Sequence, residues 1–103
     1  MRLAYFYDEI PSEEEKTYRF DFAINVNKLI LWKIETDNEL TLVDSNILER
    51  LPDSKQLKII GKFDARLELS PADIRNVIYF TFKNETSTTV KLFIYFHIER
   101  GRR

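Results

Sequence analysis

Cysteine is absent from this sequence, and histidine, glycine and proline are rare: one, two and three residues among 103. Without cysteine the chain has no disulfide framework, no thiolate metal site and no cysteine nucleophile, a composition that fits a reducing compartment. Two glycines are too few for a phosphate-cradling loop or a dinucleotide-binding fingerprint. The turns must therefore be built mainly from Asn, Asp, Ser and Thr.

Long apolar runs and an excess of one charge are also missing. No run reaches the ~20 residues of a membrane-spanning helix, and Asp8 and Glu9 break the N-terminal apolar stretch too early for a signal peptide. Sixteen basic and seventeen acidic residues give a formal net charge of −1 and no general attraction to nucleic acid or a membrane surface. We expect a soluble protein without nucleic-acid binding or membrane insertion, cytoplasmic by default, with a virion or cell-surface particle as the other location considered.

Apolar residues recur with a period of two, which is typical of β-strands. The composition, 44% hydrophobic and 14% aromatic, supports a single folded domain over residues 1–103. Polar segments separate most of the apolar stretches from one another. The clearest expected strands cover residues 17–26, 27–35, 39–43, 57–69, 77–83 and 89–99.

Signals for turns and a helix lie between and within these strands. Asn46 and Glu49 have the spacing of a helix capping box and Pro52 follows, which predicts a short helix over residues 46–51. Gly61, inside an expected strand, predicts a β-bulge or a close backbone approach. The other expected features are a tight hairpin at residues 26–28, a turn at 36–38, one helical turn at 70–75, a turn joining the last two strands at 84–88, and flexible segments at 8–16 and 100–103.

The final expected strand has apolar residues on both of its faces. One face carries Phe93, Tyr95 and His97, and the opposite face carries aliphatic residues and a phenylalanine. Such a strand is central in its sheet, or one of its faces is an interface. Because the last two strands are expected to form a hairpin, we predict that Tyr79, Phe93, Tyr95 and His97 together contact a protein partner or a second copy of the chain. The alternative is that residues 4–7 or the acidic N-terminal segment fold over this face.

His97 is the one candidate for acid–base or metal chemistry. It projects on the same strand face as Glu99, but a metal site needs further ligands, and no cysteine or second histidine supplies them. No nucleophile-elbow motif accompanies it, and the carboxylates of residues 8–15 lie in a polar loop where they would ionise normally. We therefore expect a hydrogen-bonded rim histidine, no enzyme activity, no metal and no cofactor.

Two short motifs are of types that can indicate nucleic-acid binding or glycosylation. Residues 100–103 contain three arginines, but no basic face accompanies them, which argues against nucleic-acid binding. Residues 84–86, NET, match the acceptor pattern of N-glycosylation, which matters only in an exported protein.

Part of the chain resembles Golgi-dynamics (GOLD) domains. The stretch KLILWKIETDNELTLV is similar to a segment in which a strand carrying tryptophan precedes a polar turn and another strand, and VIYFTFKNETSTTVKLFIYFHIE is similar to the closing hairpin of the family. The family's glycine before the aromatic strand is replaced here by SPADIRN, and no transmembrane or coiled-coil segment accompanies it. The resemblance implies a non-enzymatic β-sandwich that mediates contacts between macromolecules. It rests on Trp32, Asp37, Phe80, Phe82, Asn84 and Ser87.

These observations predict an all-β fold, an antiparallel β-sandwich of about seven strands with one short helix, of jelly-roll, immunoglobulin or GOLD-like type. The predicted function is a non-enzymatic interaction or assembly module, a subunit of a larger complex or particle. The alternative is a sandwich that binds a small ligand or carbohydrate, and an enzyme ranks below both. The predicted core comprises Phe20, Phe22, Ile24, Trp32, Leu42, Ile59, Phe63, Leu67, Phe80, Phe82, Leu92, Ile94 and Phe96.

Overall fold

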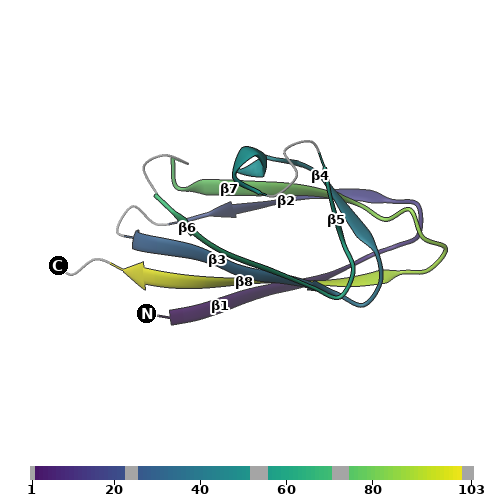
Figure 1. The fold of residues 1–103 in the computed structure, drawn as a ribbon, viewed down its shortest axis with the longest axis horizontal. Coiled ribbons are helices and arrows are strands. Elements are labelled where there is room, and N and C mark those ends of the chain that lie inside the picture. The colour runs from purple at the N-terminus through teal and green to yellow at the C-terminus, as the bar shows by residue number, and fades with distance from the viewer. Residues whose placement is uncertain (1, 23–25, 52–55, 71–74, 101–103) are drawn as a thin grey trace.

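Two antiparallel β-sheets of four strands pack face to face (Figure 1). The computed structural model describes residues 2–22, 26–51, 56–70 and 75–100. No helix in this part of the chain is long and apolar enough to cross a membrane. The predicted all-β antiparallel sandwich is confirmed. Its strands are β1 (Arg2–Ile10), β2 (Glu15–Asp21), β3 (Val26–Thr36), β4 (Leu40–Ser45), β5 (Leu57–Ile59), β6 (Lys62–Leu69), β7 (Val77–Lys83) and β8 (Val90–Arg100), with one 3₁₀ helix, η1 (Leu48–Arg50).

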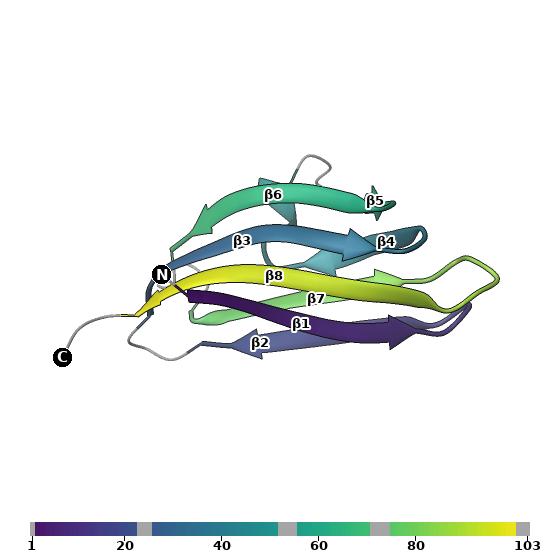
Figure 2. The same cartoon turned by 90° about the horizontal axis from the view of Figure 1, so that it is seen from below.

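The strand pairing describes a long hairpin that has been rolled up. β1 pairs with β8, β2 with β7, β3 with β6, and β4 with β5, all antiparallel. Pairing of β3 with β8 and of β4 with β7 then completes sheet A, in the order β1-β8-β3-β6, and sheet B, in the order β2-β7-β4-β5. Figure 2 shows the four strands of sheet A side by side in one layer. This connectivity is that of a jelly roll.

The core lies between the two sheets because, outside the bulges, every second residue of a strand points inward. Seven of the predicted core residues are buried: Leu42, Ile59, Phe80, Phe82, Leu92, Ile94 and Phe96. Four more are partly buried and pack against that core: Phe20, Phe22, Phe63 and Leu67. Ile24 lies outside the described residues.

Trp32 is the error in the predicted core. In the β3–β8 ladder Leu31 is opposite Phe96 and Lys33 is opposite Tyr95, so Trp32 is an extra residue without a partner on β8. A β-bulge of this kind interrupts the alternation of faces. Trp32 therefore lies half-buried on the outer side of sheet A, where the Lys33 ammonium sits over its ring.

Several predicted connections are wrong because the chain crosses between sheets where a hairpin or a continuous strand was expected. Residues 26–28 do not turn; they begin β3, whose sheet does not contain β2. Gly61, with a φ of 81°, lies at the turn between β5 and β6. Residues 84–88 likewise connect β7 in sheet B to β8 in sheet A. Inward faces of both sheets carry the same apolar alternation, so the pattern cannot tell which sheet the next strand joins.

The short helix predicted over residues 46–51 is only the 3₁₀ helix η1. Asn46 does not cap it; its side chain donates to the Val77 carbonyl at 2.8 Å and accepts the Tyr79 N–H at 3.2 Å. Residues 8–16, predicted to be flexible, are also ordered, because they include the end of β1, a tight turn and the start of β2. The predicted turn at 70–75 falls largely outside the described residues, as do residues 101–103 of the predicted flexible C-terminus.

Candidate interaction surface

The outer side of sheet A carries a layer of aromatic rings. Antiparallel pairing places Tyr5 opposite Tyr95 and Tyr7 opposite Phe93, so outward side chains of β1 and β8 lie next to each other. The bulge in β3 adds Trp32 on the other side of β8. We define the aromatic face as Tyr5, Tyr7, Trp32, Phe93, Tyr95 and His97.

Ring-to-ring contacts make this layer continuous. The Tyr95 ring centroid lies 6.0 Å from Tyr5, 6.3 Å from Phe93 and 6.0 Å from Trp32. Tyr7 lies 4.7 Å from Phe93, and His97 lies 4.8 Å from Trp32. Because these distances are typical of favourable aromatic pairs, the rings support one another and are held as one surface.

Exposure concentrates on β1, at the edge of the aromatic face. Tyr5 is 66% exposed, Leu3 49% and Tyr7 40%, and these are three of the four large hydrophobic residues that the described chain exposes. The fourth, Ile60, lies at the turn between β5 and β6. Scattered exposed apolar residues are normal, but a contiguous group indicates a contact surface.

A charged pair borders the aromatic face on β3. The Lys33 ammonium lies 4.8 Å from the ring centroids of both Trp32 and Tyr95, and it forms an ion pair with Glu35 at 3.2 Å. Partial burial, together with a hydrogen bond to Glu35, raises the pKa of Tyr95 above its ordinary value. The cation–π contacts and the ion pair therefore fix these polar groups against the rings.

A cavity of about 380 Å³ adjoins Phe93 at one end of this surface. The Asp37 carboxylate at this cavity accepts the Lys91 backbone N–H at 2.8 Å, so one of its polar groups is already engaged. Glu35 and Lys62 also form ion pairs, with Lys33 at 3.2 Å and with Asp64 at 3.6 Å, so a polar ligand would share these groups through hydrogen bonds to its hydroxyls. No group of acidic or histidine side chains among the described residues could hold a metal ion. The cavity is lined by Glu35, Thr36, Asp37, Gly61, Lys62, Lys91 and Phe93.

The structure brings together three of the four predicted contact residues. Phe93, Tyr95 and His97 share the aromatic face on β8. Tyr79 does not join them, because β7 belongs to sheet B and the Tyr79 hydroxyl reaches Asp44 at 3.5 Å on the opposite side of the sandwich. The single face predicted for all four residues depended on a β7–β8 hairpin, which does not form.

Sequence reasoning missed Tyr5, Tyr7 and Trp32. The alternative prediction, that residues 4–7 cover this face, is wrong, because β1 pairs along the edge of β8 and extends the face sideways. The alternation of Leu3, Tyr5 and Tyr7 was an available signal for a strand. The bulge that turns Trp32 outward leaves no comparable signal in the sequence.

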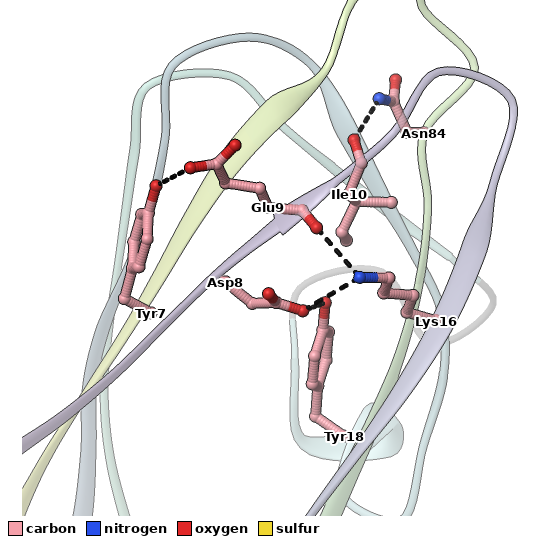
Figure 3. A network of polar contacts seen from close by, with 7 residues as sticks. All are labelled: Tyr7, Asp8, Glu9, Ile10, Lys16, Tyr18 and Asn84. Carbon is pink, nitrogen blue, oxygen red and sulfur yellow. Dashed lines mark hydrogen bonds and ion pairs between the residues drawn. The ribbon is translucent and has the colours of Figure 1, made fainter.

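A polar network fastens the C-terminal end of β1 to β2 (Figure 3). The Tyr18 hydroxyl donates to the Asp8 carboxylate at 2.6 Å, and the Lys16 ammonium donates to that carboxylate at 3.3 Å and to the Glu9 carbonyl at 3.0 Å. The Tyr18 hydrogen bond is the main reason that the pKa of Asp8 is lowered. The Tyr7 hydroxyl donates to the Glu9 carboxylate, which raises the pKa of Tyr7 to about 12. β1 is therefore a fixed edge strand.

Asn84 anchors the same end of the sandwich from inside. It is fully buried, and its amide group donates to the Ile10 and Thr88 carbonyls, both at 2.8 Å. Its side-chain oxygen accepts the Thr86 N–H at 2.9 Å. Because both amide hydrogens are engaged, the side chain in the folded domain is not presented for glycosylation at the NET triplet.

Comparison of this chain with protein-family models, with curated proteins and with solved structures gave no match. The resemblance to GOLD domains therefore stays a prediction, and what this domain does must be argued from the aromatic face and its surroundings.

Proposed function

We propose that this domain is a non-enzymatic interaction module that contacts a protein partner through the aromatic face. The observation that carries the proposal is the continuous layer of six rings on one outer side of sheet A, with Tyr5 66% exposed. Aromatic residues are enriched at the centres of protein interfaces because each ring buries a large area with few rotatable bonds. The Lys33–Glu35 pair at its border resembles the polar rim of such interfaces.

A small-ligand or carbohydrate-binding function is the second candidate. The 380 Å³ cavity favours it, because Lys62, Lys91 and Glu35 converge there beside the ring of Phe93. Ligand sites combine an apolar wall with a few polar groups that fix orientation. The cavity touches only one ring of the aromatic face, however, so it does not account for the exposed rings of β1.

The proposal is tested by the double variant Phe93→Ser, Tyr95→Ser, with Tyr79→Ser on the opposite sheet as the matched control. Sedimentation gives the mass of the assembly, and thermal melting gives stability. We expect the double variant to assemble more weakly than the wild type, with a smaller fall in melting temperature than the core variant Phe80→Ala shows, and Tyr79→Ser to assemble as the wild type does. A large fall in melting temperature without a change in mass would mean that the rings serve internal packing.

Trp32 tests whether a carbohydrate occupies the aromatic face, and calorimetric titration of the same oligosaccharides tests the cavity, which Trp32 does not line. It is the only tryptophan in the chain and it lies in the aromatic face, so its fluorescence reports occupancy of that face. Titration with neutral oligosaccharides should leave the emission unchanged if the partner is a protein. A saturable change that Phe93→Ser abolishes would support the carbohydrate alternative instead.

A further inference from the structure

The four edge strands of the sandwich are not equally protected against pairing with another chain. Edge strands expose unpaired N–H and C=O groups, and proteins usually block them with charges, bulges or short strands. β5 has only three residues. The exposed residues of β2 are polar, and β6 carries outward charged residues and a positive φ of 45° at Arg66. β1 has none of these devices along its middle.

β1 is the longest edge strand and pairs without interruption. Its nine residues keep one register with β8 from Arg2 to Ile10. Its outward side chains in the middle are Leu3, Tyr5 and Tyr7, which are 49%, 66% and 40% exposed. A long, regular and apolar edge is a template for a further strand.

Hydrogen bonds at Glu9 show which backbone groups face the open edge. The Glu9 carbonyl accepts the Lys16 ammonium at 3.0 Å, and Lys91, opposite Glu9 on β8, turns its own N–H and C=O to Asp37 at the end of β3, so the Glu9 backbone groups point away from β8. In an antiparallel ladder every second residue points its N–H and C=O to the same side. The N–H and C=O groups of Leu3, Tyr5 and Tyr7 therefore face the open edge.

We propose that two copies of this chain pair antiparallel through their β1 edges, on a two-fold axis at Tyr5, to form one continuous eight-stranded sheet. Tyr5 then lies opposite the partner's Tyr5, and Leu3 lies opposite the partner's Tyr7. Each of these residues donates and accepts a ladder hydrogen bond. This inference rests on the proposed function as an interaction module and identifies one partner, a second copy of the chain. In the dimer the aromatic face continues across both copies.

Charge along β1 favours the antiparallel orientation. Arg2 begins the strand, and Asp8 and Glu9 end it. Antiparallel pairing on Tyr5 brings Arg2 opposite the partner's Asp8, whereas parallel pairing would place like charges together. Opposite charges on facing strands stabilise a ladder and like charges destabilise it.

An apolar cavity supports the same docking edge. Its volume is about 240 Å³, and its lining includes Ala4, Tyr5 and Phe6 of β1 together with Phe20 of β2, the edge strand of the other sheet. In the proposed register Ala4 faces the partner's Phe6 on the inner side of the sheet. The dimer therefore adds apolar contacts beside this cavity as well as ladder hydrogen bonds.

The experiment compares Tyr5→Pro with Tyr5→Ala by sedimentation over a concentration series. Proline removes the Tyr5 N–H, which faces the open edge, and it is tolerated on that side of an edge strand. Alanine removes the same ring but keeps the N–H. We expect a dimeric wild type, a dissociation constant raised by about 100-fold in Tyr5→Pro, and a change of less than about 10-fold in Tyr5→Ala.

Folding is checked by circular dichroism and thermal melting of each variant. Ala4→Pro serves as the register control, because the Ala4 N–H faces β8 and its loss should lower the melting temperature more than Tyr5→Pro does. A wild type that stays monomeric at all concentrations, or a Tyr5→Pro variant that dimerises like the wild type, would overturn the edge pairing.

The Phe93→Ser, Tyr95→Ser variant separates this inference from the proposed function, because it leaves the β1 backbone intact. If it still dimerises while Tyr5→Pro does not, the second copy binds at the edge. If it becomes monomeric while Tyr5→Pro stays dimeric, self-association uses the aromatic face, which overturns the edge pairing and supports the proposed function.

Discussion

The outer sides of the two sheets differ although both sheets close the same core. Sheet A carries a continuous layer of rings on its outer side. Sheet B presents polar contacts instead, such as the Thr17 and Thr81 hydroxyls 2.8 Å apart and an exposed ion pair of Arg19 with Asp21 at 3.2 Å. Folding requires apolar residues only on the inward faces, so it does not explain the rings of sheet A. This difference is the basis of our proposal that sheet A is the side that meets another surface.

The largest expected effect comes from the core that both sheets share. Phe80→Ala should lower the free energy of unfolding by about 3–5 kcal/mol, because the side chain is fully buried and its loss leaves a cavity. Phe93→Ala on the aromatic face should lower the free energy of unfolding by less, and so should Phe63→Ala, because both rings are only partly buried. Urea titrations of the three variants test this order. Equal losses of unfolding free energy for Phe80→Ala and Phe93→Ala would show that the outer rings stabilise the fold as much as the core does.

A smaller loss of folding stability is expected from a change at Asn84, where the two sheets are joined. Asn84→Ala removes donors from the Ile10 carbonyl, at the end of β1, and the Thr88 carbonyl, before β8. The Thr88 carbonyl keeps the Thr86 hydroxyl as a donor at 2.9 Å, but Ile10 is fully buried, and loss of a donor to a buried carbonyl costs about 1–3 kcal/mol. Chemical denaturation measures the loss, and Thr89→Ala, at an exposed neighbouring position, is the control. An Asn84→Ala variant as stable as the wild type would contradict the anchoring role.

Making the outer side of sheet B apolar should change stability very little. Thr17→Val combined with Thr81→Val loses one hydroxyl pair but keeps β-branched side chains of the same shape. We expect the free energy of unfolding to change by less than about 1 kcal/mol. A loss well above this value in urea titration would show that sheet B depends on its polar surface. Self-association by the variant would strengthen the link between apolar outer faces and assembly.

The smallest expected effect is a pH dependence at the end of β1. Hydrogen bonds from Tyr18 and Lys16 lower the pKa of Asp8 below its ordinary value of 3.8 in the folded state. The unfolded chain therefore takes up a proton at higher pH than the folded one, so the contribution of Asp8 to stability is present above about pH 4 and is lost as pH falls further. The melting temperature of Asp8→Asn should depend less steeply on pH than that of the wild type. The range to measure is about pH 2 to 6, which spans the ordinary carboxyl pKa. Parallel curves would contradict the role of Asp8.

Much of the fold was predictable because alternation is a local property of the chain. The alternating apolar residues of β7 and β8 set their bounds and their inward faces, and Phe80, Phe82, Leu92 and Ile94 are buried as predicted. Pairing was not predictable from this pattern. Residues 57–69 read as one strand, yet they cross at Gly61 from sheet B to sheet A, because a turn between sheets leaves the inward alternation nearly unchanged.

The candidate site was predicted only where it lies on a single strand. Phe93, Tyr95 and His97 follow one another at two-residue spacing on β8, and strand geometry alone puts them on one face. Adding Tyr79 required the partner strand, and the partner of β8 turned out to be β1 and β3 rather than β7. Trp32 joined the face through a bulge that the alternation does not reveal.

The sequence by itself determined an all-β chain with two-sided apolar strands, because side-chain direction alternates along any strand regardless of its neighbours. The tertiary structure alone decided that β1 lies beside β8, that Tyr79 and Tyr95 face opposite sides of the sandwich, and that the rings of sheet A are continuous. These features depend on contacts between residues far apart in the chain, which are selected by closing two sheets over one core and not by any local preference.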